Sequence, residues 1–188
     1  MLRTTFLAAV LSLPLAGAAL AEKYVIDTEG AHASINFRTG HLGFSFLTGR
    51  FDTFTGEFEF DPANPEAGSV SVEIDTASLN SNHTQRDDHL RSPDFFDAAN
   101  HPKATFVSTG ITKTGDNTAV IAGDLTLRGV TQQVEIETTY VGGGDDPWGG
   151  HRQGFTGTTS IVPADFGMPS PIAQQTVELV LEVEGIRQ

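Results

Sequence analysis

The chain has 188 residues and contains no cysteine. This absence excludes disulfide bonds, a thiolate nucleophile and a lipid attached through cysteine. A chain of this length can bury one hydrophobic core without disulfides. We therefore expect a single folded domain.

The sequence also lacks an apolar run of the about 20 residues that a membrane-spanning helix needs. The nearest candidate is the N-terminal stretch 6–15, which follows Arg3 and is interrupted by Pro14 and then Gly17. Ala19-Leu20-Ala21 has the pattern at which signal peptides are cleaved. Residues 1–21 are predicted to be a secretory signal peptide, and residues 22–188 a soluble protein of the bacterial periplasm.

Basic residues are scarce. The chain has 11 Lys and Arg against 24 Asp and Glu, a formal net charge of −13. Such a charge disfavours nucleic acids and anionic membrane surfaces as partners. It favours solubility and identifies no function.

Common catalytic motifs are missing from the sequence as well. There is no G-x-S-x-G, H-E-x-x-H, phosphate-binding loop or glycine-rich dinucleotide loop. The carboxylate pairs Asp87-Asp88 and Asp145-Asp146 fall in polar loops, where nothing signals the burial that would separate their pKa values. We expect no catalytic residue, no enzyme activity and no cofactor.

Histidines and carboxylates gather in the same polar region without the spacing of a known metal site. His83 and His89 flank Asp87 and Asp88, and His101 follows. The H-x5-H spacing matches no standard zinc motif. We therefore assign no metal.

Phenylalanine is abundant. Seven of the 13 Phe residues lie between Phe37 and Phe60, in a segment that mostly alternates and is broken by Gly. Since successive side chains of a strand point to opposite faces, one face of this sheet is loaded with aromatic rings. An eight-stranded barrel can be filled by side chains or hold one small ligand, and periodicity does not decide between them.

Short alternating segments continue through the rest of the chain. Their spacing is typical of a sandwich or barrel, and the long helical periods of a parallel α/β fold are missing. Gly- or Pro-rich loops are expected at 142–150 and 163–171. The eight or nine predicted strands are residues 24–26, 31–39, 53–60, 70–74, 105–109, 119–127, 130–141, 154–161 and 176–183.

One hairpin can be placed in register from the sequence. Arg128-Gly129 makes a two-residue turn, which sets Leu127 opposite Val130 and Ile121 opposite Ile136. One face of this hairpin is mainly apolar and the other polar, as in an antiparallel sheet that covers a core.

The segment 78–102 is too long for a tight turn and too polar for a strand. Asn82 is predicted to cap a short helix that ends near Arg91, and Ser92-Pro93 to begin a second turn. An excursion of this length in a compact β domain is usually a lid or binding loop. A lid that gates a ligand and a cap without ligand contact are equal alternatives.

His41 ends an inward-alternating run that starts at Ala33, and it lies between two glycines. A histidine on an apolar face is more often satisfied within the core than bound to a ligand. If the interior holds the head of a quinone or a phosphate, His41 can donate a hydrogen bond to it.

Four sequence blocks in order carry a family resemblance. They are Y-V-I-D; I-N-F-R-T-G-H-L-G-F-S-F-L-T-G-R-F with F-T-G-E-F; R-D-D-H-L-R-S-P-D-F-F-D with H-P-K-A-T-F; and G-D-L-T-L-R-G-V-T. The chain resembles the YceI-like family of periplasmic polyisoprenoid-binding proteins. The resemblance implies an all-β fold, a lipocalin-like antiparallel β-barrel of about eight strands with a short helical lid. It also implies an apolar tunnel for an isoprenoid chain, no catalytic residues and a possible homodimer.

Candidate ligand-binding residues follow from these blocks and from the faces of the predicted strands. They are Phe37, His41, Phe44, Phe46, Phe54, Phe58, Arg86, His89, Leu90, Phe95, Phe96, Phe106, Leu125, Leu127 and Leu179.

Three functions are compatible with these observations. The first is a periplasmic carrier or store for an isoprenoid lipid such as a quinone or polyprenyl phosphate. The second is an enzyme that acts on such a lipid through His41 or the group Arg86, Asp87 and His89. The third is a filled barrel whose lid or loops bind a protein.

Overall fold

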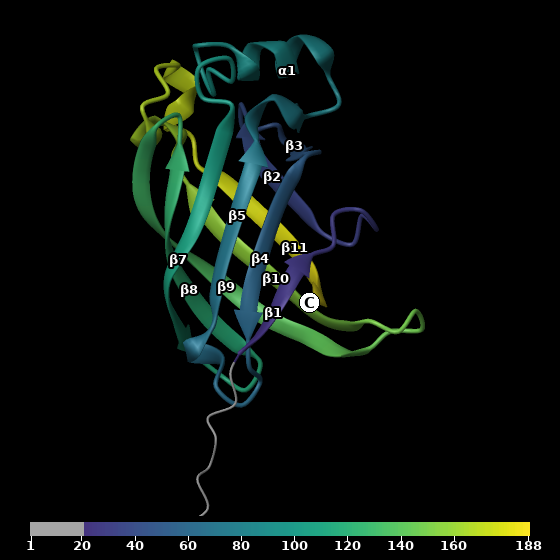
Figure 1. Ribbon diagram of the computed structural model, residues 1–188. Helices are drawn as coiled ribbons and strands as arrows, with labels where there is room; N and C mark the ends of the chain where they lie inside the picture. The colour runs from purple at the N-terminus through teal and green to yellow at the C-terminus, as the bar shows by residue number, and fades with distance from the viewer. Residues whose placement is uncertain (1–20) are drawn as a thin grey trace, which may run out of the picture.

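The computed structural model describes residues 21–188 as one antiparallel sheet of eleven strands. Eight of these strands close into a barrel in the order β1-β4-β5-β7-β8-β9-β10-β11, because β11 pairs back onto β1 (Figure 1). The predicted all-β barrel with a short helix is confirmed. The elements are β1 (Glu22–Ile26), β2 (Ser34–His41), β3 (Ser45–Phe51), β4 (Phe54–Phe60), β5 (Ser69–Asp75), β6 (Leu79–Asn80), α1 (Thr84–Arg91), β7 (Lys103–Lys113), β8 (Thr118–Leu127), β9 (Val130–Asp145), β10 (His151–Ile161) and β11 (Val177–Arg187).

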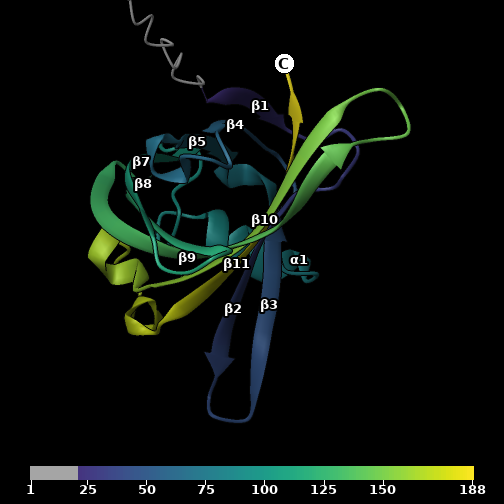
Figure 2. The same cartoon turned by 90° about the horizontal axis from the view of Figure 1, so that it is seen from below.

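One edge of β11 pairs with two different strands. Its last residues pair with β1, whereas Val177–Glu182 pair with β2. The short strands β2, β3 and β6 therefore continue the sheet beyond the closed barrel. Figure 2 shows the β2–β3 hairpin projecting away from the barrel body.

The β8–β9 hairpin has the predicted register. Leu127 pairs with Val130, and Ile121 pairs with Ile136. Arg128 and Gly129 both have positive φ, at 50° and 75°, which is the conformation of a type I′ turn and matches the twist of the strands.

Large aromatic side chains fill part of the barrel, and some lie directly on glycines. Tyr24 is fully buried and stacks on Phe58 with ring centroids 5.0 Å apart. A Cβ added at Gly185 would lie 2.3 Å from the Phe58 ring, and one at Gly123 would lie 2.3 Å from the Phe106 ring. Only a residue without a side chain leaves room for these rings.

The lid differs in detail from its prediction. Helix α1 begins at Thr84, and His83 is its N-cap, with Nδ1 accepting a hydrogen bond from the Arg86 backbone at 3.2 Å. The prediction of Asn82 as the cap was wrong, since Asn82 has a φ of 61° and belongs to the preceding turn. Ser92 is the C-cap of α1, and the predicted second turn follows it over residues 93–96, where the Phe95 backbone N donates to the Ser92 carbonyl at 3.0 Å.

Two loop predictions also need correction. Strand β3 was missing from the predicted strands, and the loop predicted at 142–150 is confined to residues 146–150, because β9 continues to Asp145 and β10 begins at His151. The loop at 163–171 contains one short 3-10 helix, Pro163–Phe166, and leads into a second, Pro171–Gln174. These two turns cover the same end of the barrel as α1 (Figure 1).

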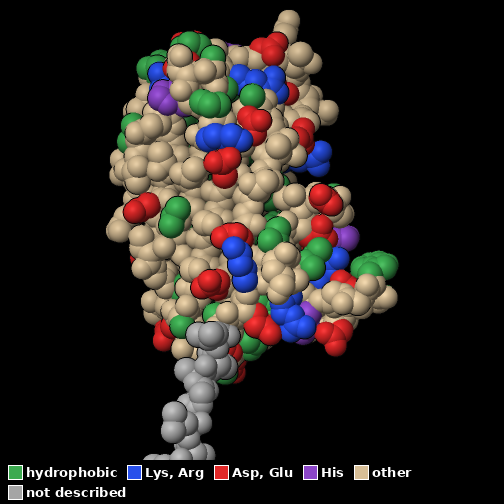
Figure 3. Space-filling view, in the orientation of Figure 1, with side chains coloured by type: hydrophobic (Ala, Val, Ile, Leu, Met, Phe, Trp, Pro, Cys, Tyr) green, Lys and Arg blue, Asp and Glu red, His purple; other side chains and the backbone are tan. Residues whose placement is uncertain are grey.

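The outer wall is mostly polar. The face seen in Figure 3 carries acidic and basic side chains scattered among other polar groups and backbone, with separate hydrophobic side chains between them. Within the described part of the chain, we find no helix with the length and apolar character needed to cross a bilayer. The predicted signal peptide lies outside the described residues except for Ala21 and stays a prediction.

Candidate functional site

Two apolar cavities lie inside the barrel. The outer cavity, beneath the lid, has a volume of about 340 Å³, and the inner cavity has a volume of about 180 Å³. Both are lined by Ile35, Ile74, Leu125 and Leu179. The cavities therefore meet end to end at these four aliphatic side chains, which we call the waist.

The lid covers part of the outer cavity. Leu90 comes from α1, and Phe95 and Phe96 come from the turns that follow it. Met168 and Ala173, from the segment between β10 and β11, complete the cover. Phe95 and Met168 are buried, so the lid packs on the barrel as part of its core.

The inner cavity is the more uniformly aromatic and aliphatic of the two. Phe54, Phe58, Phe106 and Phe155 line it, together with in-facing residues of β8, β9 and β11. The Phe58 and Phe155 rings meet edge to face with centroids 5.5 Å apart. An environment of this kind suits a hydrocarbon chain and gives a polar group little to bind.

Polar side chains gather at the lid end of the outer cavity. Arg86 Nε donates to Ser81 Oγ at 2.7 Å, and Arg86 Nη2 donates to the Ser81 carbonyl at 2.6 Å. His89 and His41 also border this cavity. A ligand with one polar end and an apolar tail would place its polar end here.

Asp87 supports this polar group from behind. Its carboxylate is buried and accepts hydrogen bonds from the Ser81 hydroxyl and from the Ser81 backbone N at 2.9 Å. Burial raises the pKa of Asp87, but the two bonds from Ser81 and the charge of Arg91 outweigh it, so its pKa lies below the ordinary value. Asp87 therefore stays ionised and anchors α1 to the turn that carries Ser81.

Most of the predicted site residues line one of the cavities. The structure places Phe37, His41, Arg86, His89, Leu90, Phe95, Phe96 and Leu127 around the outer cavity, Phe54, Phe58 and Phe106 around the inner cavity, and Leu125 and Leu179 at the waist. His41 is exposed at the rim rather than satisfied within the core. This makes it accessible to a polar head.

Phe44 and Phe46 do not lie in either cavity, and their inclusion with the inward-facing residues was wrong. They are 87% and 60% exposed. They were included because they belong to the block that carries the family resemblance. The inward-alternating run stops at the turn 41–44, and Phe44 and Phe46 follow it on a hairpin that projects away from the barrel (Figure 2).

Several lining residues were missed by the sequence analysis. Ile35 belongs to the predicted inward run and Ile74 to a predicted alternating strand, but neither was chosen as a ligand-binding candidate. Phe51 belongs to the phenylalanine-rich segment and is buried at the outer cavity. Met168 and Ile172 lie in a segment without periodicity, where no sequence signal separates a lining residue from a loop residue.

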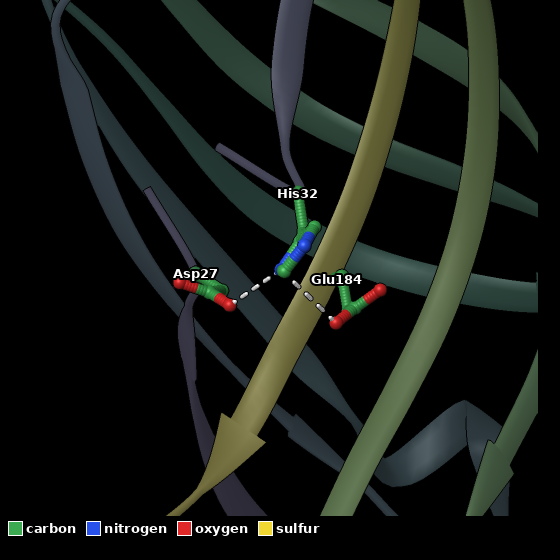
Figure 4. Close-up of side chains that lie close together, drawn as sticks. All are labelled: Asp27, His32 and Glu184. Carbon is green, nitrogen blue, oxygen red and sulfur yellow. Dashed lines mark hydrogen bonds and ion pairs between the residues drawn. The ribbon is translucent and has the colours of Figure 1, made fainter. Parts of the chain in front are cut away.

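A second polar cluster lies on the barrel away from the lid. His32 Nδ1 is 2.9 Å from Asp27 Oδ2 and 3.7 Å from Glu184 Oε1 (Figure 4). These three residues have the donor types of a metal site. However, Arg152 Nη1 already lies 2.6 Å from Asp27 and 2.5 Å from Glu184, and Arg152 Nε is 2.6 Å from Asp146.

The hydrogen bond from Arg152, followed by that from His32, lowers the pKa of Asp27 to about 2. A resident guanidinium thus supplies the positive charge that these carboxylates need. We interpret the cluster as an ion-pair network that ties β1, β10 and β11 together.

The histidines near the lid each have a separate partner. His83 caps α1, His89 Nε2 lies 3.1 Å from Asp94, and His101 lies 4.0 Å from Asp97. One ring nitrogen each of His83 and His89 is therefore engaged locally, whereas the separation of His101 and Asp97 is too long for a hydrogen bond.

Comparisons with known proteins agree on one family. Residues 24–185 match the model of the YceI-like domain. A UPF0312 protein of Ectopseudomonas mendocina is 50% identical over 191 residues, covering 100% of both chains. A UPF0312 protein of Vibrio cholerae is 51% identical over 182 residues, covering 97% of this chain and 95% of its own.

Solved structures share the fold. Burkholderia cenocepacia BcnA superposes with a TM-score of 0.76 at 25% identity, over 85% of this chain and 98% of that chain. A polyisoprenoid binding domain from Saccharophagus degradans has a TM-score of 0.65 at 18% identity, over 90% of this chain and 100% of that chain. The family predicted from the sequence is confirmed.

Proposed function

The chain belongs to the YceI-like family, and from this premise we propose that it is a periplasmic carrier that holds one isoprenoid lipid inside its barrel. The observation that carries the proposal is the pair of apolar cavities that meet at the waist, with polar side chains at the lid end. The isoprenoid tail occupies the cavities, and a quinone or phosphate head lies beside Arg86, His89 and His41.

Burial of the tail supplies the affinity. Each methylene removed from water contributes roughly 0.8 kcal/mol, so a few isoprene units hold the ligand without any polar contact. Arg86 is already fixed by Ser81, so little side-chain freedom is lost when it meets a head group. The fold of the Saccharophagus degradans domain, whose name gives polyisoprenoid binding, is compatible with this cargo.

The proposal assigns binding and release to the protein and no chemical step. Two members of the group considered for catalysis, Arg86 and Asp87, are bound to Ser81, and His89 lies beside Asp94. We expect cargo to leave the protein chemically unchanged.

Native mass spectrometry tests the proposal. The protein purified from cells should carry a stoichiometric adduct, and solvent extraction should release a lipid with a five-carbon repeat. A protein that has a clean apo mass and stays so after incubation with quinones and polyprenols would show that the cavities are not a lipid site.

A further inference from the structure

The β2–β3 hairpin ends in an exposed apolar tip beside the mouth of the outer cavity. Leu42 is 73% exposed, Phe44 87% and Phe46 60%. His41, Leu42 and Leu47 also line the outer cavity. A molecule that covers the tip would therefore also lie against the rim of the outer cavity.

Leu42 occupies an unfavourable backbone position. Leu42 and Gly43 have φ values of 53° and 76°, and the Phe44 backbone N donates to the His41 carbonyl at 2.9 Å. This turn favours Asn or Asp before Gly, since a leucine with positive φ is strained. An exposed leucine that costs conformational energy points to a use for its side chain.

The hairpin differs in charge from the rest of the chain. Residues 34–51 contain Arg38, His41 and Arg50 and no carboxylate, in a chain with 24 acidic residues. Arg38 stacks on the Phe46 ring with its guanidinium carbon 3.5 Å from the centroid, and it also pairs with Glu178 at 3.6 Å. Arg50 pairs with Asp52 at the base, so Arg38 and His41 are the basic groups nearest the tip.

The β9–β10 hairpin provides a natural contrast. It also projects from the barrel (Figure 2), and it exposes 77% of Trp148. However, the exposed carboxylate of Asp145 lies at this tip, and Arg152, 5.5 Å from the Trp148 ring, is already paired with Asp27, Asp146 and Glu184. The two hairpin tips therefore differ in charge, although both expose an aromatic side chain.

We propose that the tip formed by Leu42, Phe44 and Phe46 inserts into the surface of an anionic phospholipid bilayer and places the cavity mouth against it. Apolar side chains beside arginine are the composition that lies at the boundary of head groups and acyl chains. The acidic barrel does not prevent this approach, because charges farther than about 8 Å from the surface are largely screened at physiological ionic strength.

A bilayer fits the tip better than a second copy of the chain does. The cargo proposed above must enter from a lipid phase, and Leu42 of the tip and Ile172 are both exposed and line the outer cavity. A second copy would cover the tip but offer no lipid. The inference rests on the proposed function, because docking serves a protein that exchanges lipid. Docking itself can be measured without cargo.

Vesicle flotation tests the proposal. The protein is mixed with vesicles of phosphatidylethanolamine and phosphatidylglycerol, and the double variant Phe44→Ser/Phe46→Ser is compared with the matched control Trp148→Ser. We expect the double variant to lose roughly tenfold or more of its vesicle binding, and the control to bind like the unaltered protein. Equal binding by all three proteins overturns the proposal.

Leu42→Asn separates docking from folding. Asn suits the left-handed turn, so this variant should melt at a higher temperature than the unaltered protein and yet bind vesicles less. A variant that is more stable and binds vesicles equally well overturns the role of Leu42. Because Trp148 is the only tryptophan, Phe44→Trp in a Trp148→Phe background reports insertion as a blue shift of its fluorescence.

Two further measurements distinguish the alternatives. Native mass spectra of the same samples report cargo and oligomeric state. Hairpin-dependent vesicle binding by a cargo-free protein supports docking and counts against the carrier. Full cargo with no vesicle binding, or a dimer that dissociates in Phe44→Ser/Phe46→Ser, overturns docking in favour of free exchange or of a second copy.

Discussion

At the scale of single residues, glycines that lie against aromatic rings stabilise the fold by leaving room for the rings. Gly123 of β8 lies under Phe106, whereas Gly144 of β9 has open space where a Cβ would be. We expect Gly123→Ala to lower the free energy of unfolding by about 1–3 kcal/mol, because the added methyl forces the ring from its position. Gly144→Ala should change it by less than about 1 kcal/mol.

Urea titration of the two variants measures the difference. Equal effects of Gly123→Ala and Gly144→Ala would contradict the packing argument. Sequence alone did not identify Gly123 as a contact site, because the ring that needs the space comes from a neighbouring strand.

Asp27 provides a pH-dependent contribution to stability. Its folded pKa is about 2, below the ordinary 3.8, mainly because of the hydrogen bond from Arg152. A lowered pKa means that the contribution is complete above pH 3.8 and is lost as the pH falls toward 2. Since Asp27 is buried, the network contributes up to about 2 kcal/mol.

Unfolding measured between neutral pH and about pH 2.5 tests this window. The unaltered protein should lose stability more steeply below about pH 4 than Asp27→Asn does. Parallel curves for the two proteins would show that Asp27 is not the titrating group. The variant should also be less stable at neutral pH, because Asn pairs weakly with Arg152.

At the scale of elements, regular strands were predictable and irregular segments were not. The register of β8–β9 followed from Arg128-Gly129 and a one-sided apolar pattern. Strand β3 was missed because Phe46 and Leu47 are adjacent apolar residues and break the alternation with polar neighbours. The lid helix was found, but its cap was assigned to Asn82 because histidine is an uncommon N-cap.

The same distinction applies to the site. Alternation identifies which residues of a strand face inward, so Leu125, Leu127 and Leu179 were found correctly as lining positions. Membership of a family motif does not report where a hairpin leaves the barrel, which is why Phe44 and Phe46 were misplaced. Alternation does not identify Met168, whose burial depends on how an irregular segment folds over the barrel end.

At the scale of the whole molecule, the waist divides the binding space into an outer and an inner part. A short isoprenoid chain fills the outer cavity alone, whereas a longer chain must pass Leu125 and its neighbours to reach the inner cavity. Leu125 and Leu127 lie on the same face of β8 and are equally buried, at 6% exposure each. Leu127 lines the outer cavity only.

This pair gives a direct test of how cargo length is set. Leu125→Trp should block the waist, so that extracted or added lipids shift to shorter chains while short-chain binding persists. Leu127→Trp should weaken binding of all chain lengths, because it narrows the cavity that every cargo occupies. Both substitutions overpack the core and cost about 1–3 kcal/mol of stability. Because this loss is common to the two variants, it cannot explain a difference between them in chain-length preference. If Leu125→Trp binds long and short chains in the same ratio as the unaltered protein, the tail does not pass the waist and the inner cavity is packing space.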